Sequence, residues 1–342
     1  MTVQSIKCPN CGGGLKFNPE LQKSKCEYCL SEFTTEELDK LVEDFQYKKA
    51  EHDHLMGYIC NSCGAEVVTK ETTSATFCYY CHNPVLLTER LTGEFKPTKI
   101  IPFAYDKDKA VSSFLSWAKS KKFVPKDFYS DSQLEKITGI YIPYWMADVE
   151  ANVNYFGKGI NLRVWRTGNT EYTEHKEYRI DRRGTIDVNN IHELAMRKID
   201  KALIDSISPY DESKAVDFSM SYLSGFFAEK YDIQKDEVSF SIEDRAKNYV
   251  SNLMQDSIGS YNKVYMENTD MDLSIKGWNY TLLPAWILTY MYNGKTYIYA
   301  VNGQTGKSFG ELPVDNKKLG ATSGMIAAAV FAIAIIGGMM IW

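Results

Sequence analysis

The eight cysteines are the residues whose type and spacing most clearly predict a chemistry. They form four Cys-x-x-Cys pairs near the N-terminus, and each cysteine of the second group lies 52 positions after its counterpart in the first (Cys60 after Cys8). Two thiols separated by two residues can bind one metal ion from a tight turn, and two such pairs complete a tetrahedral four-thiolate site. The two predicted quartets are Cys8, Cys11, Cys26 and Cys29, and Cys60, Cys63, Cys78 and Cys81.

This repeat predicts two zinc ribbons, each with one structural Zn²⁺ ion. Four cysteine ligands leave no coordination position for a catalytic water, so the metal is expected to stabilise the fold. Disulfides and a redox centre are the alternatives. The short segment before Cys8 has no room for a signal peptide, which disfavours disulfides. A redox Cys-x-x-Cys pair usually lies at the start of a helix in a βαβ unit, which four pairs in register do not resemble.

The sequence patterns around these sites divide the chain into five segments. They are a zinc ribbon at 1–33, a helical spacer at 34–57, a second zinc ribbon at 58–90, a main domain at 97–315 and an apolar helix at 320–342. Thr34 and Glu37 form a capping box at the start of the spacer helix. Gly12 and Gly64 follow the second cysteine of a pair, where a left-handed residue is useful.

The main domain mixes helical and strand patterns without a regular βαβ rhythm, which predicts the α+β class. We expect helices opening at Asp106, after Asn189 and Asn190, and at a Ser241-x-x-Asp244 cap, with a long strand over 140–156 and a hairpin over 290–301. Pro143-x-Trp145 resembles Pro284-x-Trp286, which raises the hypothesis of an internal duplication.

The C-terminal segment at 320–342 contains no charged residue, which predicts one transmembrane helix. Lys317 and Lys318 precede it, so the positive-inside rule predicts a tail-anchored, single-pass protein of the cell membrane. Its N-terminal domains would be cytoplasmic and its C-terminus would lie at the outer interface. The lipid bilayer is then an expected partner through residues 320–342.

Charge and motif content argue against nucleic-acid binding and against catalysis. The net charge is −5, and residues 1–96 hold 10 basic and 14 acidic side chains, so the clustered positive charge that nucleic acids require is absent. The Gly303–Ser308 segment lacks the first glycine of a P-loop. We therefore expect no catalytic residues, no enzyme activity and no small-molecule substrate.

The combination of two four-cysteine ribbons, a central domain with Ile142-Pro143-Tyr144-Trp145 and an apolar C-terminus resembles the bacterial YdjG-type membrane proteins. These are also described as zinc-ribbon proteins of the transcription-factor-IIB type. The resemblance covers nearly the full length. It implies a place in envelope-stress biology, with membrane proteins and a phage-shock-A-like protein as partners, and no known catalysis.

The function predicted from these observations is a non-enzymatic, membrane-anchored adaptor that recruits proteins to the inner membrane face. Apolar ribbon side chains are the expected contacts, unless they pack on the main domain; they are Leu15, Phe17, Tyr28, Tyr79 and Tyr80. The alternative is a zinc-ribbon protein that binds nucleic acid while tethered to the membrane.

Overall fold

The computed structural model describes residues 6–42, 55–59, 66–70, 73–77, 84–87, 91, 93–125, 137–197, 199–292 and 295–341. The N-terminal part is a three-stranded antiparallel sheet of β1 (Leu15–Asn18), β2 (Lys23–Cys26) and β3 (Glu32–Phe33). Helix α1 (Thr35–Val42) follows it, and the Thr34 N–H donates to Glu37 Oε2 at 2.8 Å. The predicted capping box is therefore the start of this helix.

Four further short strands precede the main body. Strands β4 (Leu55–Ile59) and β5 (Glu66–Lys70) form a separate two-stranded sheet. Strands β6 (Thr73–Phe77) and β7 (Pro84–Leu86) pair with each other, and β6 also pairs with β12 (Phe227–Glu229). The second of these two hairpins is therefore part of the large sheet of the main body.

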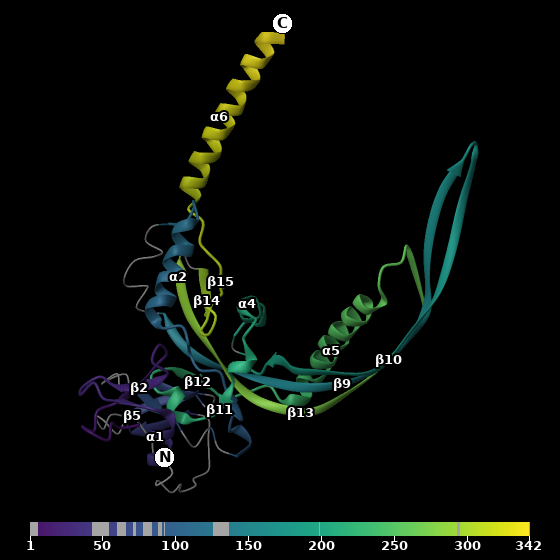
Figure 1. The fold of residues 1–342 in the computed structure, drawn as a ribbon. Coiled ribbons are helices and arrows are strands. Elements are labelled where there is room, and N and C mark those ends of the chain that lie inside the picture. Colours follow the sequence, from purple (N-terminus) through teal and green to yellow (C-terminus); the bar gives the residue numbers. More distant parts are fainter. Residues whose placement is uncertain are drawn as a thin grey trace.

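The main body is built around one large sheet (Figure 1). Its strand order is β11-β8-β13-β9-β12-β6-β7, with β10 beside β9 and with β14 and β15 beyond β13. In chain order, its elements after β7 are β8 (Lys99–Ile100), α2 (Lys107–Ser120), β9 (Thr138–Thr167), β10 (Thr170–Leu194), α4 (Lys201–Ile207), β11 (Val216–Asp217), β12, α5 (Lys235–Ile258), β13 (Lys263–Tyr292), β14 (Lys295–Asn302), β15 (Ser308–Gly310) and α6 (Asn316–Ile341). Short 3₁₀ turns lie at η2 (Gly93–Phe95), η4 (Glu212–Lys214) and η5 (Met220–Leu223).

The centre of this sheet has a local two-fold symmetry in its strand pairing. The two Pro-x-Trp segments lie side by side on the antiparallel strands β9 and β13, where Pro143 pairs with Leu282 and Pro284 with Tyr141. On the outer side, β12 runs parallel to β9 and β8 runs parallel to β13 at the matching positions. Each of these outer strands is followed by a helix, α5 or α2.

The two tryptophans of these segments have matching roles. Trp145 Nε1 donates to the Ile233 carbonyl at 2.8 Å, and Trp286 Nε1 donates to the Tyr105 carbonyl at 2.7 Å. Both carbonyls lie in the loop that joins an outer strand to its helix. Both indoles are therefore core residues that fix a strand–helix connection.

A long arm on the α5 side of the sheet breaks this two-fold pattern, because the α2 side has no such extension. Strands β9, β10 and β13 continue together as a curved ribbon, and α5 covers one face of it (Figure 1). The alternation at Val149, Ala151, Val153 and Tyr155 supplies the apolar face under α5. Beyond the pair of Lys263 with Ile160, β9 and β10 continue as a two-stranded hairpin.

Two predictions about architecture are wrong. The chain does combine α and β elements, but the main body is mostly one β-sheet, because β9, β10 and β13 are each far longer than their sequence patterns. The predicted transmembrane helix at 320–342 falls in α6, whose described side chains are those of 316–331 and 335. Within the described part of the chain, no helix has the length and apolar character needed to cross a membrane.

A membrane span needs about 20 consecutive apolar residues. The described side chains of α6, those of 316–331 and 335, include Asn316, Lys317, Lys318, Thr322 and Ser323 and supply no apolar run of that length. The predicted localisation, a single-pass protein of the cell membrane with cytoplasmic N-terminal domains, depended on that transmembrane helix. This prediction is therefore wrong as well.

Candidate metal centre

Two backbone turns of the same construction present the first cysteine quartet. In the first turn, Gly12 donates its N–H to the Cys8 carbonyl at 2.8 Å, and in the second, Leu30 donates to the Cys26 carbonyl at 3.1 Å. The residue after the second cysteine of each pair is left-handed, with φ of +75° at Gly12 and +61° at Leu30. The turns therefore hold the two thiols of each pair on the same side of the backbone.

The four sulfur atoms of Cys8, Cys11, Cys26 and Cys29 all lie within 4.8 Å of one another. The Sγ atoms of Cys8 and Cys29 are 3.5 Å apart, as are those of Cys11 and Cys26. A tetrahedral zinc site with bonds of about 2.3 Å requires sulfur–sulfur distances of about 3.8 Å. The cluster could therefore hold one metal ion without rearrangement of the backbone.

The protonation of these thiols shows why a cation suits the cluster. The Gly13 N–H lowers the pKa of Cys11, but contacts with the thiols of Cys29, Cys26 and Cys8 raise it to about 12. The hydroxyl and N–H of Ser31 lower the pKa of Cys29 to about 6. Cys11 therefore keeps its proton beside the Cys29 thiolate, and a divalent cation would favour the thiolate form of both.

The sheet that carries the cysteine cluster is fixed to the main body through β1. The Phe17 N–H donates to the Ser224 carbonyl at 2.9 Å, and the Ser224 hydroxyl donates to the Leu15 carbonyl. The Phe17 ring meets Tyr222 edge-on at 5.1 Å between centroids. Gln22 Nε2 also donates to the Phe103 carbonyl at 2.8 Å. The ribbon is therefore a docked part of the structure.

This docking decides which apolar ribbon side chains are accessible. Leu15 and Phe17 are buried, so the prediction that they stay exposed for a partner is wrong, and they pack in the ribbon and body cores instead. Tyr28 is 74% exposed and Leu30 is 65% exposed, both beside Cys29. Tyr79, Tyr80 and the second quartet, Cys60, Cys63, Cys78 and Cys81, lie outside the described residues.

A buried ionic network around Glu193 has no counterpart in the sequence predictions. Glu193 is only 5% exposed, and its carboxylate pairs with Lys201 Nζ, with Arg245 Nη2 at 3.3 Å and with the Ser241 hydroxyl at 3.0 Å. Asp205 also lies 3.5 Å from Arg245. The network joins β10 to α4 and α5, so its evident role is to hold these helices on the sheet.

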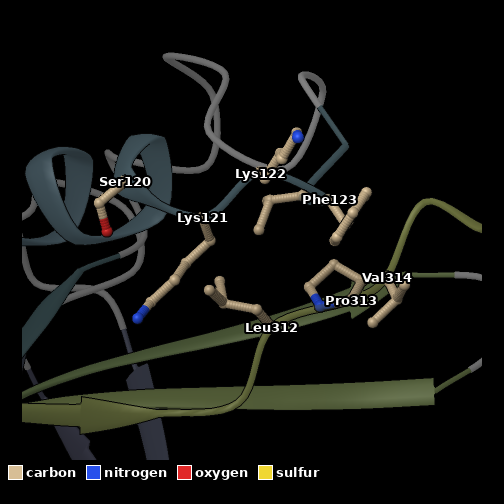
Figure 2. Close-up of a pocket in the computed structure, with 8 residues that line it drawn as sticks. Ser120, Lys121, Lys122, Phe123, Leu312, Pro313 and Val314 are labelled. Atoms are coloured by element: carbon tan, nitrogen blue, oxygen red, sulfur yellow. The ribbon is translucent and has the colours of Figure 1, made fainter. Parts of the chain in front are cut away.

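A shallow apolar pocket of about 340 Å³ lies between the end of α2 and the segment before α6 (Figure 2). Its apolar lining is formed by Phe123, Val124, Leu312, Pro313 and Val314. The side chains of Lys121 and Lys122 extend in different directions. Its lining has no carboxylate, histidine or cysteine. These residues therefore provide no acid–base pair and no metal ligand.

Comparison with known proteins gives one informative relative. The chain is 31% identical over 339 residues to an uncharacterized protein, YdjG, of Bacillus subtilis (strain 168), and the alignment covers 99% of this chain and 98% of that protein. No family model matches the chain. No solved structure matches it.

Proposed function

This chain belongs to the YdjG family, and we propose that it is a non-enzymatic adaptor whose zinc-stabilised ribbon binds a partner protein. The proposal assigns the metal a structural role and places the partner contact on the exposed side of the second turn, at Tyr28 and Leu30. A phage-shock-A-like protein, which the family resemblance implies, is the first candidate partner. The docked ribbon supports this proposal, because a rigid contact loses little entropy on binding.

Zinc is the proposed metal because four thiolates in a tetrahedral arrangement are the ligand set that structural zinc prefers. We propose one ion at Cys8, Cys11, Cys26 and Cys29, and a second at the repeated quartet. A ribbon this small cannot bury a sufficient apolar core, so metal binding supplies about 10–16 kcal/mol of its folding free energy. The first ion also holds the turn that carries Tyr28 and Leu30.

The observation that carries the adaptor proposal is the conformation of Leu30. A left-handed backbone costs a leucine roughly 1–2 kcal/mol, whereas the matching position in the first turn is Gly12, which adopts it freely. The Leu30 side chain is nevertheless exposed and contributes little to the core. Strain retained at an exposed apolar residue points to a function for that side chain.

The neighbouring tyrosine has a fixed position as well. A Cβ atom at Gly13 would lie 2.6 Å from the Tyr28 ring, so the ring lies directly against that glycine. Tyr28 and Leu30 together form an exposed apolar pair beside a rigid turn, as is typical of protein-contact residues. Charge does not favour nucleic acid here, because residues 1–96 carry 14 acidic side chains against 10 basic ones.

A substitution at Leu30 can separate an effect on partner binding from an effect on the stability of the ribbon. Leu30→Gly should relieve the backbone strain and leave zinc content unchanged, yet weaken binding of the full-length chain to a purified phage-shock-A-like protein by about tenfold or more. Leu21→Ala, an exposed leucine elsewhere on the ribbon, is the matched control and should bind like the wild type. Tyr28→Ala should weaken this binding as Leu30→Gly does. Equal binding by both variants and the wild type, or salt-sensitive binding to DNA or RNA instead, would reject the proposal.

A further inference from the structure

Strand β10 forms a long open edge of the sheet. Over Thr170–Leu194 it pairs with β9 on one side, and no described strand pairs with its other side. Every second residue of such a strand directs its backbone N–H and C=O away from the sheet. Figure 1 shows that the hairpin of β9 and β10 extends past α5 and away from the rest of the body. Most side chains over 171–185 are exposed, so this part of the edge is accessible.

The charges along this edge are divided between its two halves. The first half carries the acidic side chains Glu171, Glu174 and Glu177, and the second half carries Arg179, Arg182 and Arg183. Tyr178 lies between the two halves. Two residues depart from this division: Lys176 in the first half pairs with Glu174 at 3.5 Å, and Asp181 in the second half pairs with Arg179 and Arg183 at 3.2 and 3.0 Å. These ion pairs are solvent-exposed and easily rearranged.

We propose that the β10 edge pairs with β10 of a second copy of this chain, antiparallel, with the two-fold axis at Tyr178. Antiparallel pairing reverses the strand, so the acidic half of each copy lies opposite the basic half of the other. Glu177 then faces Arg179 of the partner copy, Glu174 faces its Arg182, and His175 faces its Asp181. Each pair occurs twice by symmetry, and the two arms form one continuous sheet.

Symmetry and charge together select this register. In an antiparallel pair, directly opposite residues point to the same face of the sheet. A two-fold axis perpendicular to the sheet keeps every residue on its own face, so the axis can pass only through a residue and not between two residues. An axis at Glu177 places that carboxylate opposite itself, and an axis at Arg179 places two guanidinium groups opposite each other, both of which are unfavourable. At Tyr178 the self-paired residue is an aromatic ring that already packs on Tyr261, 5.6 Å away.

The proposed pairing satisfies the backbone as well as the side chains. Pairing residues 171–185 of both copies would form about 16 inter-chain backbone hydrogen bonds. Glu177 faces Arg179 on the face of the arm opposite α5, whereas Glu174 faces Arg182 on the α5 side, so both faces carry opposite-charge pairs. An edge that matches itself in this way is the isologous interface expected of a two-fold dimer.

The first experiment is a charge exchange in the full-length chain, followed by sedimentation velocity. Wild type should form dimers at micromolar concentration, and E174R/E177R and R179E/R182E should each weaken self-association by about tenfold or more. A mixture of these two variants should restore the dimer, because every arginine then faces a glutamate. The control E243R/D256R changes the net charge as E174R/E177R does, but on α5, and should dimerise like the wild type.

The second experiment fixes the position of the axis and does not depend on the charge variants folding. Tyr178→Cys should form an inter-chain disulfide under mild oxidation, because it lies opposite itself. Tyr172→Cys would lie opposite Gly184 of the partner copy and should not cross-link above the wild-type background. A monomeric wild type at about 100 μM, an unrestored mixture, or equal cross-linking at 172 and 178 would each overturn the proposal.

Discussion

Removing the carboxylate of Glu193 should destabilise the main body more than removing an exposed glutamate from the same sheet. Glu193 neutralises Lys201 and Arg245 in a site where its own side chain is only 6% exposed. Loss of one partner from a buried ion pair typically costs about 3–5 kcal/mol, because the remaining charge is left without compensation. Lys201 and Arg245 retain 44% and 27% exposure, and Asp205 lies 3.4 and 3.5 Å from them, so water and Asp205 compensate part of that loss. We therefore expect about 3 kcal/mol for Glu193→Ala.

The matched control is Glu267→Ala. Glu267 pairs with Lys158 at 3.7 Å, and both side chains are about half exposed. Exposed pairs contribute about 0–1 kcal/mol, so this substitution should be nearly neutral. Glu193→Gln removes the charge but keeps an acceptor for Ser241, and its cost should fall between those of the two alanine variants.

Urea unfolding monitored by tryptophan fluorescence measures these differences in the free energy of unfolding. Similar midpoints for the Glu193 and Glu267 alanine variants would refute the inference that the network holds α4 and α5 on β10. A cost for Glu193→Gln equal to that of Glu193→Ala would assign the stability to charge alone and leave no contribution from the Ser241 hydrogen bond.

Two further predictions follow from the symmetry of the body and from the metal site. Trp145→Phe leaves the Ile233 carbonyl without its indole donor, and Trp286→Phe does the same to the Tyr105 carbonyl. Each substitution should lower the free energy of unfolding by about 1–3 kcal/mol in the same assay. A strong effect at one site only would contradict the equivalence of the two tryptophans. Elemental analysis of full-length protein purified without chelator should give about two zinc ions per chain, and Cys26→Ser should lower this to about one; a ratio that Cys26→Ser leaves unchanged would contradict the proposed site.

Local signals predicted the elements whose causes are local. The capping box at Thr34 and Glu37 begins α1, and Asp106 caps α2 by accepting from the Lys109 N–H at 2.7 Å. The spacing of the first four cysteines predicted a cluster that the structure forms. In each case the interacting groups lie close in sequence or are held by tight turns, so their pattern can be recognised directly.

The errors arose where distant strands decide the conformation. Asn189 and Asn190 resemble a helix N-terminus, but Asn190 has a φ of +56° and donates its N–H to Asp148 Oδ1 at 2.9 Å, which makes this position an irregularity in the β9–β10 pairing. The residues after it continue β10. The strand predicted over 140–156 extends to Thr167 because β10 pairs with it throughout and β13 follows it to Ile160.

The buried Glu193 network could not be predicted for a related reason. Its partners come from α4 and α5, between 8 and 52 positions along the chain from Glu193, and none of them forms a local motif with it. The third helix shows a smaller error. The Ser241 cap was expected to begin it, but α5 begins at Lys235 after a capping box of Gln234 and Glu237. Ser241 lies inside the helix and is used instead to bind Glu193.

The difference in length between α2 and α5 explains why the arm exposes an edge of its sheet to a partner and not an apolar face. Helix α2 has 14 residues and α5 has 24, although each follows its outer strand at the same point of the two-fold pattern. The additional turns of α5 place Val250 and Met254 over Ala151, Val153 and Tyr155, the apolar face that the longer strands create. A ribbon of this length without such a helix would expose that face to water. The arm and its helix are therefore extended together. Among the described strands, both edges of the arm keep open backbone groups, along β10 and along residues 263–280 of β13, and the divided charges of the β10 edge fit a second copy of the same strand.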